Sequence, residues 1–391
     1  MITSVLVAGA RTPVGRFLGM FKDIPVTELG SVAIAAALDR ARIAAADVDA
    51  VFMGTVVQAG AGPNPARIAA AGAGVPMSVP CTTINKLCLS GLTSVALADQ
   101  AIRLGLADVV VAGGMESMSG APHLLPGLRR GAKFGAGPSI VDALVSDALH
   151  CVFDQELVGA ATERYLMPFG ISRARHDEFA LRSHQRASAA AATLAEEIVP
   201  GPGSKAARTQ DEGVRARITA DELGRLPSAF ASGGVITAGS ASPLSDGAAA
   251  VVVMRRDLAE ERGLPWIAEI AGYASVAGPD ASLVAQPANA ILEALNRENL
   301  TPDDLDLVEI NEAFAGVVMH SSDLLGLDDA RVNVNGGAIA IGHPVGMSGT
   351  RLVLTLALEL NRRGGGTGVA ALCGGGGQGD ALILRATGPR P

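Results

Sequence analysis

The stretch AALDRARIAAADVDAV at residues 36–51 recurs as EALNRENLTPDDLDLV at residues 293–308, and this repeat decides the fold. The two copies align without a gap, because Ala37 matches Ala294 and Asp49 matches Asp306 at one offset of 257 residues (294 − 37 and 306 − 49). Each copy has the pattern of a helix, a polar turn and an apolar strand. Such self-similarity indicates an internal duplication.

The repeat continues downstream of both copies. SGLTSVALADQAIRLG at residues 90–105 and SGTRLVLTLALELNRRG at residues 348–364 are matching predicted helices. Each leads into an apolar strand, at residues 109–112 and 368–372. Alternating helices and strands in each half predict an α/β fold of two duplicated halves, each a mixed sheet covered by helices.

A segment unlike either copy separates the two halves. It contains glycine and proline clusters and one amphipathic stretch, RARHDEFALRSHQRASAAA, from residue 173. We interpret residues 119–244 as an inserted loop domain, with residues 1–118 and about 245–268 forming the N-terminal half and residues 269–391 the C-terminal half. The apolar run SDGAAAVVVMRRD from residue 245 is predicted to be a strand that returns to the first half. A third, independent domain is the alternative.

The composition excludes several classes of protein. Of the 391 residues 49% are hydrophobic and 18% are charged, which is too apolar for a disordered chain. No apolar run reaches the length of about 18 residues that a membrane span needs, so we expect no membrane association. The 31 basic residues are scattered among 39 acidic ones, which argues against a nucleic-acid partner. The four cysteines are sparse and form no Cys-x-x-Cys pair, so the sequence suggests neither disulfides nor a metal site. Because the sequence also shows no secretory signal pattern, we expect a cytoplasmic location.

Cys88 is the best candidate for a nucleophile. It lies in TTINKLCLSGL, at the foot of the predicted helix that starts at residue 90. Ligands of such sheets gather where strands lead into helices, and the helix dipole there stabilises a thiolate. The sequence therefore predicts a lowered pKa for the Cys88 thiol, and a packed structural cysteine is the alternative.

His343 lies in the equivalent loop of the second half, NGGAIAIGHPVGMSG. Because Gly91 and Gly349 correspond, a pseudo-twofold packing of the two halves would bring Cys88 and His343 together. The other histidines lie in polar or helical surroundings and are expected at the surface or at an interface: His123, His150, His176, His184 and His320.

Two further loops follow predicted strands. ALCGGGGQGD places Cys373 before four glycines, whose backbone N–H groups can hold an oxyanion. Gly374, Gly376 and Gly379 also fit a dinucleotide-binding pattern, but DALILRAT after them alternates like a strand and does not begin a helix. VEINEAFAG places Asn311 at a strand end, where a turn or capping residue is the alternative interpretation.

Taken together, these segments resemble the thiolases, the acyl-CoA:acetyl-CoA C-acyltransferases, along nearly the whole chain. NKLCLSGL is similar to their nucleophile motif, NEAFA and GGAIAIGHPVGMSG to their second and third signatures, and CGGGGQG to their C-terminal cysteine motif. GPNPAR, GGMESMS and TAGSASPLSDGAAA are supporting matches in the expected order. The resemblance implies a thiolase-like fold of layered αβαβα arrangement.

The resemblance also implies roles for individual residues. Cys88 would be acylated, His343 would be its base, and Cys373 would exchange a proton with the α-carbon of the substrate. His343 and a water held by Asn311 would stabilise the enolate, while the backbone N–H groups of Cys88 and Gly375 would stabilise the tetrahedral intermediate. The inserted domain would bind coenzyme A (CoA), and the residues that match family positions there are Arg215, Phe230, Ala238 and Ser242.

The expected activity interconverts acetyl-CoA and acyl-CoA with 3-ketoacyl-CoA and CoA, on short to medium chains such as acetoacetyl-CoA, without a metal or redox cofactor. Many short-chain thiolases have His-Met-Gly where this chain has Leu157-Val158-Gly159. The sequence therefore does not decide how long the acyl chain of the substrate is. A ketoacyl-synthase-type condensing enzyme, which usually has a second histidine in place of Asn311, and a non-catalytic acyl-CoA or lipid carrier are the alternatives. Thiolases are typically dimers or tetramers, so a homodimer or homotetramer is expected.

Overall fold

The computed structural model describes residues 2–131, 134–135, 137, 139–203 and 209–388. One large mixed sheet runs through the molecule in the order β12-β13-β14-β11-β1-β10-β5-β3-β4, with β2 paired to β10. Its strands are β1 (Ser4–Arg11), β2 (Gly15–Arg16), β3 (Ala50–Gly54), β4 (Cys81–Ile84), β5 (Val109–Ser117), β10 (Ser245–Arg255), β11 (Ala268–Ala277), β12 (Leu307–Ile310), β13 (Gly366–Gly374) and β14 (Gln378–Ala386).

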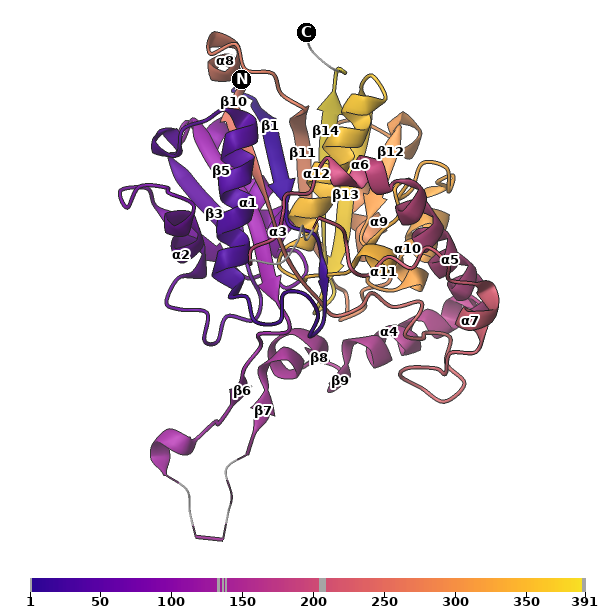
Figure 1. Cartoon of the computed structure of the whole chain (residues 1–391). Coiled ribbons are helices and arrows are strands. Elements are labelled where there is room, and N and C mark those ends of the chain that lie inside the picture. The colour runs from indigo at the N-terminus through magenta and orange to yellow at the C-terminus, as the bar shows by residue number, and fades with distance from the viewer. Residues whose placement is uncertain (1, 132–133, 136, 138, 204–208, 389–391) are drawn as a thin grey trace.

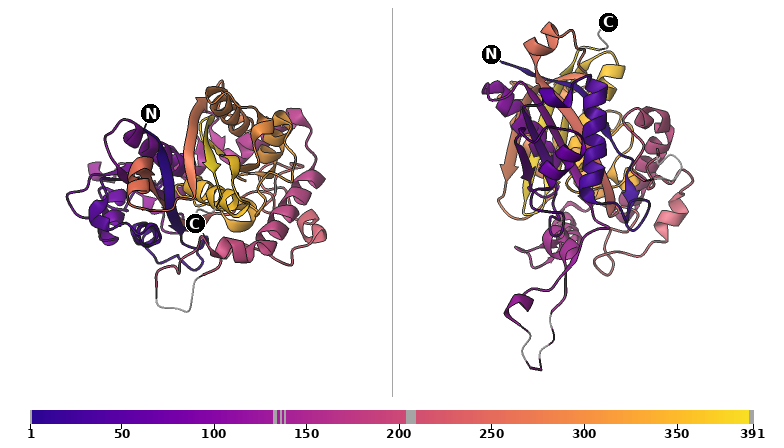
Figure 2. Two further views of the ribbon diagram at one scale, coloured as in Figure 1. Left: turned by 90° about the horizontal axis from the view of Figure 1, so that it is seen from above. Right: turned by 60° about the vertical axis from the view of Figure 1, so that its left-hand side comes forward.

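The duplication is visible in the sheet. Strands β3, β5, β10 and β1 of the first half correspond to β12, β13, β14 and β11 of the second half. In both halves the first pair is parallel and the next two pairs are antiparallel. The halves meet at the short antiparallel contact of β1 with β11, where Leu6 lies opposite Ala268. Figure 2 (left) shows the indigo and the yellow half side by side.

Helices cover both halves in the predicted layers (Figure 1). The helices of the described chain are α1 (Val26–Ala41), α2 (Pro65–Gly72), α3 (Ser90–Arg103), α4 (Val158–Leu166), α5 (Arg173–Ala189), α6 (Ala191–Ala195), α7 (Ala220–Gly224), α8 (Arg256–Glu261), α9 (Gln286–Arg297), α10 (Ala315–Leu325), α11 (Ala338–Ile341) and α12 (Ser348–Arg362). Helix α1 packs on the first half, and α9 and α10 pack on the second. Helices α3 and α12 share a core with strands of both halves, so they form the middle layer. The αβαβα arrangement is confirmed.

The repeated sequence forms the same structure twice. Helix α1 is followed by a 3₁₀ turn at Ala45–Asp47 and by β3, while α9 is followed by a 3₁₀ turn at Pro302–Asp304 and by β12. Apolar side chains of α1 such as Leu29 and Ile34 are fully buried because they recur at helical spacing on the face that covers the sheet.

The segment between β5 and β10 carries α4 to α7 and an arm. The arm is a hairpin of β6 (His123–Leu124) and β7 (Val141–Asp142) that projects from the body, and β8 (His150–Cys151) pairs with β9 (Glu156–Leu157) beside it (Figures 1 and 2). Buried residues of α4, α5 and α7 belong to the same core as α9 and α10: Leu166, Phe179, Ala180 and Leu223. These helices therefore pack on the second half, whereas Leu194 of α6 packs with Val14 and Ala249 of the first half. The boundaries of the insertion at 119 and 244 stay a prediction. No helix in the described part of the chain is both long and apolar enough to cross a membrane.

Candidate active site

Cys88 lies in the turn between β4 and α3. Leu87 before it adopts the left-handed conformation, with a φ of 53°. The Ser90 hydroxyl closes the turn, since it accepts the N–H of Lys86 at 2.8 Å and donates to the carbonyl O of Leu87 at 2.6 Å. Small polar side chains at helix starts satisfy such backbone groups. The Cys88 side chain is half-buried and lines a cavity.

His343 lies in the loop between α11 and α12, and its ring is held on both sides. Nδ1 lies 2.6 Å from the Oγ of Ser348, and this hydroxyl donates to the carbonyl O of Pro344. Nδ1 therefore carries the ring proton, which leaves a lone pair on Nε2. The Asn311 amide nitrogen lies 3.4 Å from Nε2. This arrangement leaves Nε2 able to accept a proton.

Two matching glycines bring these loops together. Helices α3 and α12 cross at Gly91 and Gly349, the second residue of each helix. A Cβ on Gly91 would lie 2.9 Å from the Thr350 hydroxyl, and a Cβ on Gly349 would collide with the backbone N of Leu92. Only glycine lets the two backbones approach this closely. The predicted pseudo-twofold packing of the Cys88 and His343 loops is thereby explained.

Cys373 lies near the end of β13, beside the turn that carries Cys88. It is 1% exposed, and the glycines after it pack on the residues that flank Cys88. A Cβ on Gly374 would lie 2.6 Å from Leu89, and a Cβ on Gly375 would lie 2.6 Å from Leu87. Strand β14 follows these glycines, so the dinucleotide-binding alternative is wrong because its helix is missing.

An ion pair fastens the turn of Cys88 to the second half. The Nζ of Lys86 lies 2.6 Å from the carboxylate of Asp380 on β14 and also donates to Ser275. Thr93 on α3 donates to the other oxygen of Asp380 at 2.8 Å. Since Asp380 is fully buried, this cluster fixes the turn relative to the β13–β14 loop.

Cys88, His343, Cys373 and Gly375 all line one cavity of about 510 Å³. Most of its wall is apolar, which suits a ligand with an acyl chain. The six residues of the predicted CoA and acyl wall line the same cavity: Leu157, Val158, Arg215, Phe230, Ala238 and Ser242. The structure thus brings ten of the eleven predicted site residues together around one space.

Asn311, the remaining predicted residue, lies just behind the cavity. It is fully buried, and its amide oxygen has no hydrogen-bond partner among the described residues. An unpaired buried acceptor beside the base is unusual, and a bound water would satisfy it.

Burial controls the protonation of the three side chains. It raises the pKa of Cys88 to about 12, with the nearby carboxylate of Glu116 adding to the rise although the backbone N–H of Cys88 opposes it. The lowered thiol pKa expected from the start of α3 is therefore wrong, because the loss of hydration outweighs the helix dipole. Burial and the neighbouring Cys88 also raise the pKa of Cys373. Burial lowers the pKa of His343 to about 3, and the charge of Arg351 adds to this. Both thiols and the imidazole are neutral at pH 7.

The inserted segment forms the far wall of the cavity. Phe230 packs edge-on against Phe314 with the ring centres 6.1 Å apart, and a Cβ on Gly159 would collide with the Phe230 ring. The Ser242 hydroxyl donates to the carbonyl O of Ala313 at 3.2 Å. These contacts fix the aromatic wall opposite Cys88.

Several residues that shape the site were not predicted from the sequence. Ser348 orients the imidazole, and Lys86 and Asp380 hold the nucleophile turn. Glu116 is fully buried and accepts backbone N–H groups of Val56, Val57 and Gly346 at 2.9–3.1 Å. The repeat could have identified Ser348, because Ser348 has the same position in the second copy as Ser90 has in the first.

Three histidines are also placed differently from the prediction. His176, His184 and His320, which were expected at the surface or at an interface, are 0%, 4% and 9% exposed. His176 and His184 lie on the face of α5 that packs against the body of the protein, because the amphipathic pattern of this helix includes them on its buried side. His320 is among the buried residues of α10.

Comparison with known proteins agrees with this geometry. Residues 4–257 match the family model of the thiolase N-terminal domain, and residues 264–386 match that of the thiolase C-terminal domain. The chain belongs to the thiolase family.

Curated relatives extend over the whole chain. It is 55% identical over 388 residues to a probable acetyl-CoA acetyltransferase of Mycolicibacterium smegmatis, covering 97% of this chain and 100% of that protein. It is 54% identical to a probable acetyl-CoA acetyltransferase of Mycobacterium tuberculosis over 99% of this chain and 100% of that protein. It is 48% identical to the acetyl-CoA acetyltransferase of Cupriavidus necator over 98% of this chain and 99% of that protein.

Proposed function

We propose that this thiolase interconverts acetyl-CoA and acyl-CoA with 3-ketoacyl-CoA and CoA through an acyl group carried on Cys88. The observation that supports this most strongly is that Cys88, His343 and Cys373, from three separate loops, line one largely apolar cavity. The relatives named above carry the name of the same activity.

The first half-reaction is acylation of Cys88. Nε2 of His343 takes the proton of the Cys88 thiol, and the thiolate attacks the thioester carbonyl. The tetrahedral oxyanion is stabilised by the backbone N–H groups of Cys88 and Gly375, each worth about 3 kcal/mol. The carbon–sulfur bond to CoA breaks, and the CoA thiolate takes the proton of the Cys373 thiol and departs, which leaves Cys373 as a thiolate.

The second half-reaction forms the carbon–carbon bond. Cys373, as a thiolate, removes a proton from the α-carbon of acetyl-CoA, and the enolate attacks the acyl group on Cys88. The carbon–sulfur bond to Cys88 breaks, and the Cys88 thiolate takes back the proton that His343 carried. A thiol whose pKa burial has raised is a strong base once deprotonated, which suits a weakly acidic C–H group. His343 and a water bound to the free oxygen of Asn311 stabilise the enolate. Thiolysis is the reverse sequence.

These steps use only side chains and backbone groups of this chain, so we propose that no metal or redox cofactor takes part. The assay is to mix the purified protein with acetoacetyl-CoA and CoA and to measure acetyl-CoA by mass spectrometry, with peptide mapping of the acylated residue. We expect turnover and acetylation of Cys88. An acyl-CoA carrier would bind without turnover, and a ketoacyl synthase would prefer substrates on acyl-carrier protein; either result would contradict the proposal.

We propose short to medium acyl chains as substrates. Leu157 and Val158 place aliphatic groups on the acyl wall, and the cavity volume of about 510 Å³ has room beyond an acetyl group. A series of 3-ketoacyl-CoA substrates of increasing length measures this. We expect kcat/KM to stay high from four carbons to a medium chain and to fall for long chains; the opposite trend would contradict the assignment.

We further propose a homodimer or homotetramer in the cytoplasm. The arm between β6 and β7 exposes large apolar side chains away from the body, a feature typical of subunit contacts: Leu125, Leu128, Phe134 and Ile140. Native mass spectrometry of the purified protein tests the assembly, and a monomer would contradict it. Fractionation of the source cells tests the location.

A further inference from the structure

The turn that carries His343, residues 343–348, docks into the first half of the molecule; we call it the base turn. The carbonyl O of its Gly346 lies in a socket of three glycines from β3, α3 and β5. A Cβ on Gly54 or Gly91 would lie 2.9 or 2.8 Å from this oxygen, and a Cβ on Gly114 would collide with it. The first half is therefore shaped to receive the backbone of the base turn, since only glycine leaves it this space.

Glu116 on β5 holds the same residue of the base turn by its N–H. Oε2 of Glu116 accepts the N–H of Gly346 and the N–H of Val56, both at 2.9 Å. Oε1 accepts the N–H of Val57 at 3.1 Å and the Thr55 hydroxyl at 3.4 Å. The carboxylate is fully buried, where charge-assisted hydrogen bonds are strong. One side chain thus ties the base turn to the segment that follows β3.

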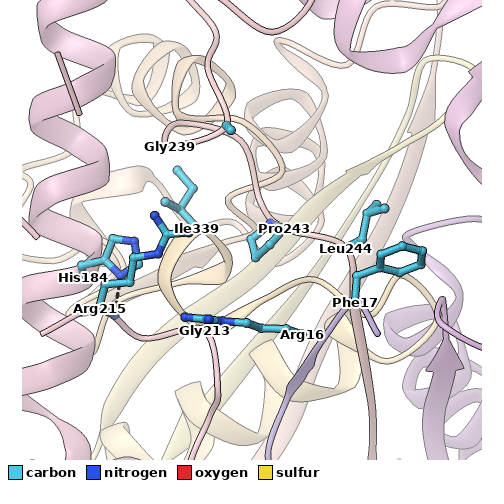
Figure 3. A pocket seen from close by; sticks show the side chains of 10 residues that line it. Arg16, Phe17, His184, Gly213, Arg215, Gly239, Pro243, Leu244 and Ile339 are labelled. Carbon is cyan, nitrogen blue, oxygen red and sulfur yellow. Dashed lines mark hydrogen bonds between the residues drawn. The ribbon is translucent and has the colours of Figure 1, made fainter. Parts of the chain in front are cut away.

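The base turn is held less firmly on its other side. Helix α11, which leads into the turn, borders a cavity of about 260 Å³ that Ile339 lines (Figure 3). One further hydrogen bond ties the backbone of the turn to the first half, from the N–H of His343 to the Ser245 hydroxyl at 3.2 Å. The position of the turn therefore depends on its contacts with the first half.

The base turn is a rigid unit, so a shift of Gly346 moves the imidazole. The N–H groups of Met347 and Ser348 both donate to the carbonyl O of Pro344 at 3.0 Å. The Ser348 hydroxyl in turn contacts Nδ1 of His343. A general base must lie within about 3 Å of the proton that it takes, and a misplacement of about 1 Å can cost on the order of 10²-fold in rate.

We propose that Glu116 is a positioning residue for the base: its carboxylate fixes the base turn in the glycine socket and thereby sets the approach of the His343 Nε2 to the Cys88 thiol. This inference rests on the proposed function, which makes His343 the base. Glu116 itself does not line the catalytic cavity, so it acts through His343 and not on the substrate.

The charge of Glu116 and its anchoring role have opposite effects on Cys88. Burial, and to a smaller extent the Glu116 carboxylate, raises the pKa of the Cys88 thiol to about 12. Loss of this negative charge alone would therefore make the thiol easier to deprotonate and faster to react. Loss of the anchor would move His343 away and make the thiol slower to react. The direction of the change in reactivity distinguishes the two roles.

The test is to measure the alkylation of Cys88 by iodoacetamide in Glu116→Gln, with peptide mapping to separate Cys88 from the other cysteines. The Gln amide nitrogen cannot accept an N–H, so part of the anchor is lost. We expect alkylation to slow about tenfold and kcat to fall about 10- to 100-fold, with KM changed less than about twofold. Measurement at pH 8 keeps the wild-type carboxylate ionised, because burial raises the pKa of Glu116 only to about 7.

Two further variants control this test. Glu116→Asp keeps the charge but is one methylene too short to reach Gly346, so it should also slow alkylation, and it carries the test if Glu116→Gln does not fold. Asp49→Asn is the matched control, because Asp49 accepts the N–H groups of Asp108 and Val109 at 2.8 and 2.9 Å at the opposite end of β3 and β5. It should keep the wild-type kcat and alkylation rate.

A double variant tests whether Glu116 acts through the docking of Gly346. A Cβ on Gly346 would lie 2.7 Å from the carbonyl O of Met115 and 2.8 Å from Oε2 of Glu116, so Gly346→Ala should push the turn out of the socket. If both changes disturb one contact, Glu116→Gln with Gly346→Ala should be about as slow as the slower single variant. Full multiplication of the two losses would show that they act independently and would overturn the inference.

Other outcomes also decide against it. Faster or unchanged alkylation in both Glu116 variants would overturn the inference, because the carboxylate would then act by charge or not at all. An equal fall of kcat in Asp49→Asn would reduce the effect to a general loosening of β3 and β5. If the wild-type protein does not convert acetoacetyl-CoA and CoA, the proposed function fails. If it does so and Glu116→Gln keeps the wild-type kcat, only the inference about Glu116 fails.

Discussion

The turns Asn85–Ser90 and His343–Ser348 are two copies of one structural element, and they carry different chemistry. Both precede a middle-layer helix, and each ends in a serine whose hydroxyl braces the turn. Ser90 binds only backbone groups of its turn, whereas Ser348 binds the ring of His343. At the position of Cys88 the second copy has Gly346, and at the position of His343 the first copy has Asn85.

This difference shows how a duplicated frame becomes a catalytic site. Asn85 uses its side chain for structure, since it donates to the carbonyl O of Val56 and accepts the N–H of Leu87. In the second copy the same position carries an imidazole that faces the cavity. Gly346 donates its N–H to Glu116, and a Cβ at this position would lie 2.7 Å from the carbonyl O of Met115, so the second turn has no room for a side chain there. One turn thus supplies the nucleophile and the other supplies the base.

The largest expected effect comes from removing the sulfur of the first turn. Cys88→Ala should abolish covalent acylation and lower kcat by on the order of 10⁴-fold or more, because Cys88 is the nucleophile and the other thiol of the cavity, Cys373, acts on the α-proton. Mass spectrometry after mixing with acetyl-CoA measures it. A labelled acyl group that remains bound to this variant would show that the first turn does not supply the nucleophile.

Cys373→Ser should separate the two half-reactions. A serine hydroxyl is too weak an acid to exchange the α-proton, so condensation should slow by about 10²- to 10⁴-fold. Acylation of Cys88 should remain, because the Cys88 turn and His343 are intact. The single-turnover rates of acylation and of carbon–carbon bond formation are to be measured separately. Loss of acylation, or carbon–carbon bond formation at the wild-type rate, would contradict the assignment of Cys373.

The repeat in the sequence predicts that the two turns lie together, but it does not predict the pKa values or the ion pair of their side chains. Downstream of the first match the offset grows by one residue to 258 (349 − 91), which places Gly91 opposite Gly349, and from that the meeting of Cys88 and His343 follows. The raised pKa of Cys88 depends on how many distant groups exclude water around it, which no local pattern encodes. The ion pair of Lys86 with Asp380 joins residues that are 294 positions apart in the sequence, so it depends on the packing of the two halves.

The turns should also differ in their response to acid. Burial lowers the pKa of His343 to about 3, below its ordinary value of 6.5, so the unfolded chain takes up this proton first as the pH falls. The contribution to the free energy of unfolding is present above pH 6.5, and about 2–3 kcal/mol of it should be lost by pH 4.5. Urea unfolding at pH 7.5 and 4.5 should show a loss that is about 2–3 kcal/mol smaller in His343→Gln than in the wild type, since burial also lowers the pKa of His184, to about 4, in both proteins. Asn85→Ala is the matched control from the first turn and should keep the wild-type pH dependence. An equal loss in His343→Gln would show that His343 is not the group that titrates.

The smallest expected effect distinguishes the two serines. Ser348→Ala removes the partner of the His343 Nδ1–H, so the ring loses its orientation, and kcat should fall about tenfold with little change in KM. Ser90→Ala removes only bonds to the backbone, so it should lower the free energy of unfolding by about 1–2 kcal/mol and change kcat less. The pH profile of kcat is the further readout, since only Ser348 contacts the titrating ring. If Ser90→Ala lowered kcat as much as Ser348→Ala, with the same shift of the pH profile, the two turns would not divide their roles as proposed. If instead the two effects separate as expected, the serine that the halves share is a structural brace in one turn and a positioning residue for the base in the other.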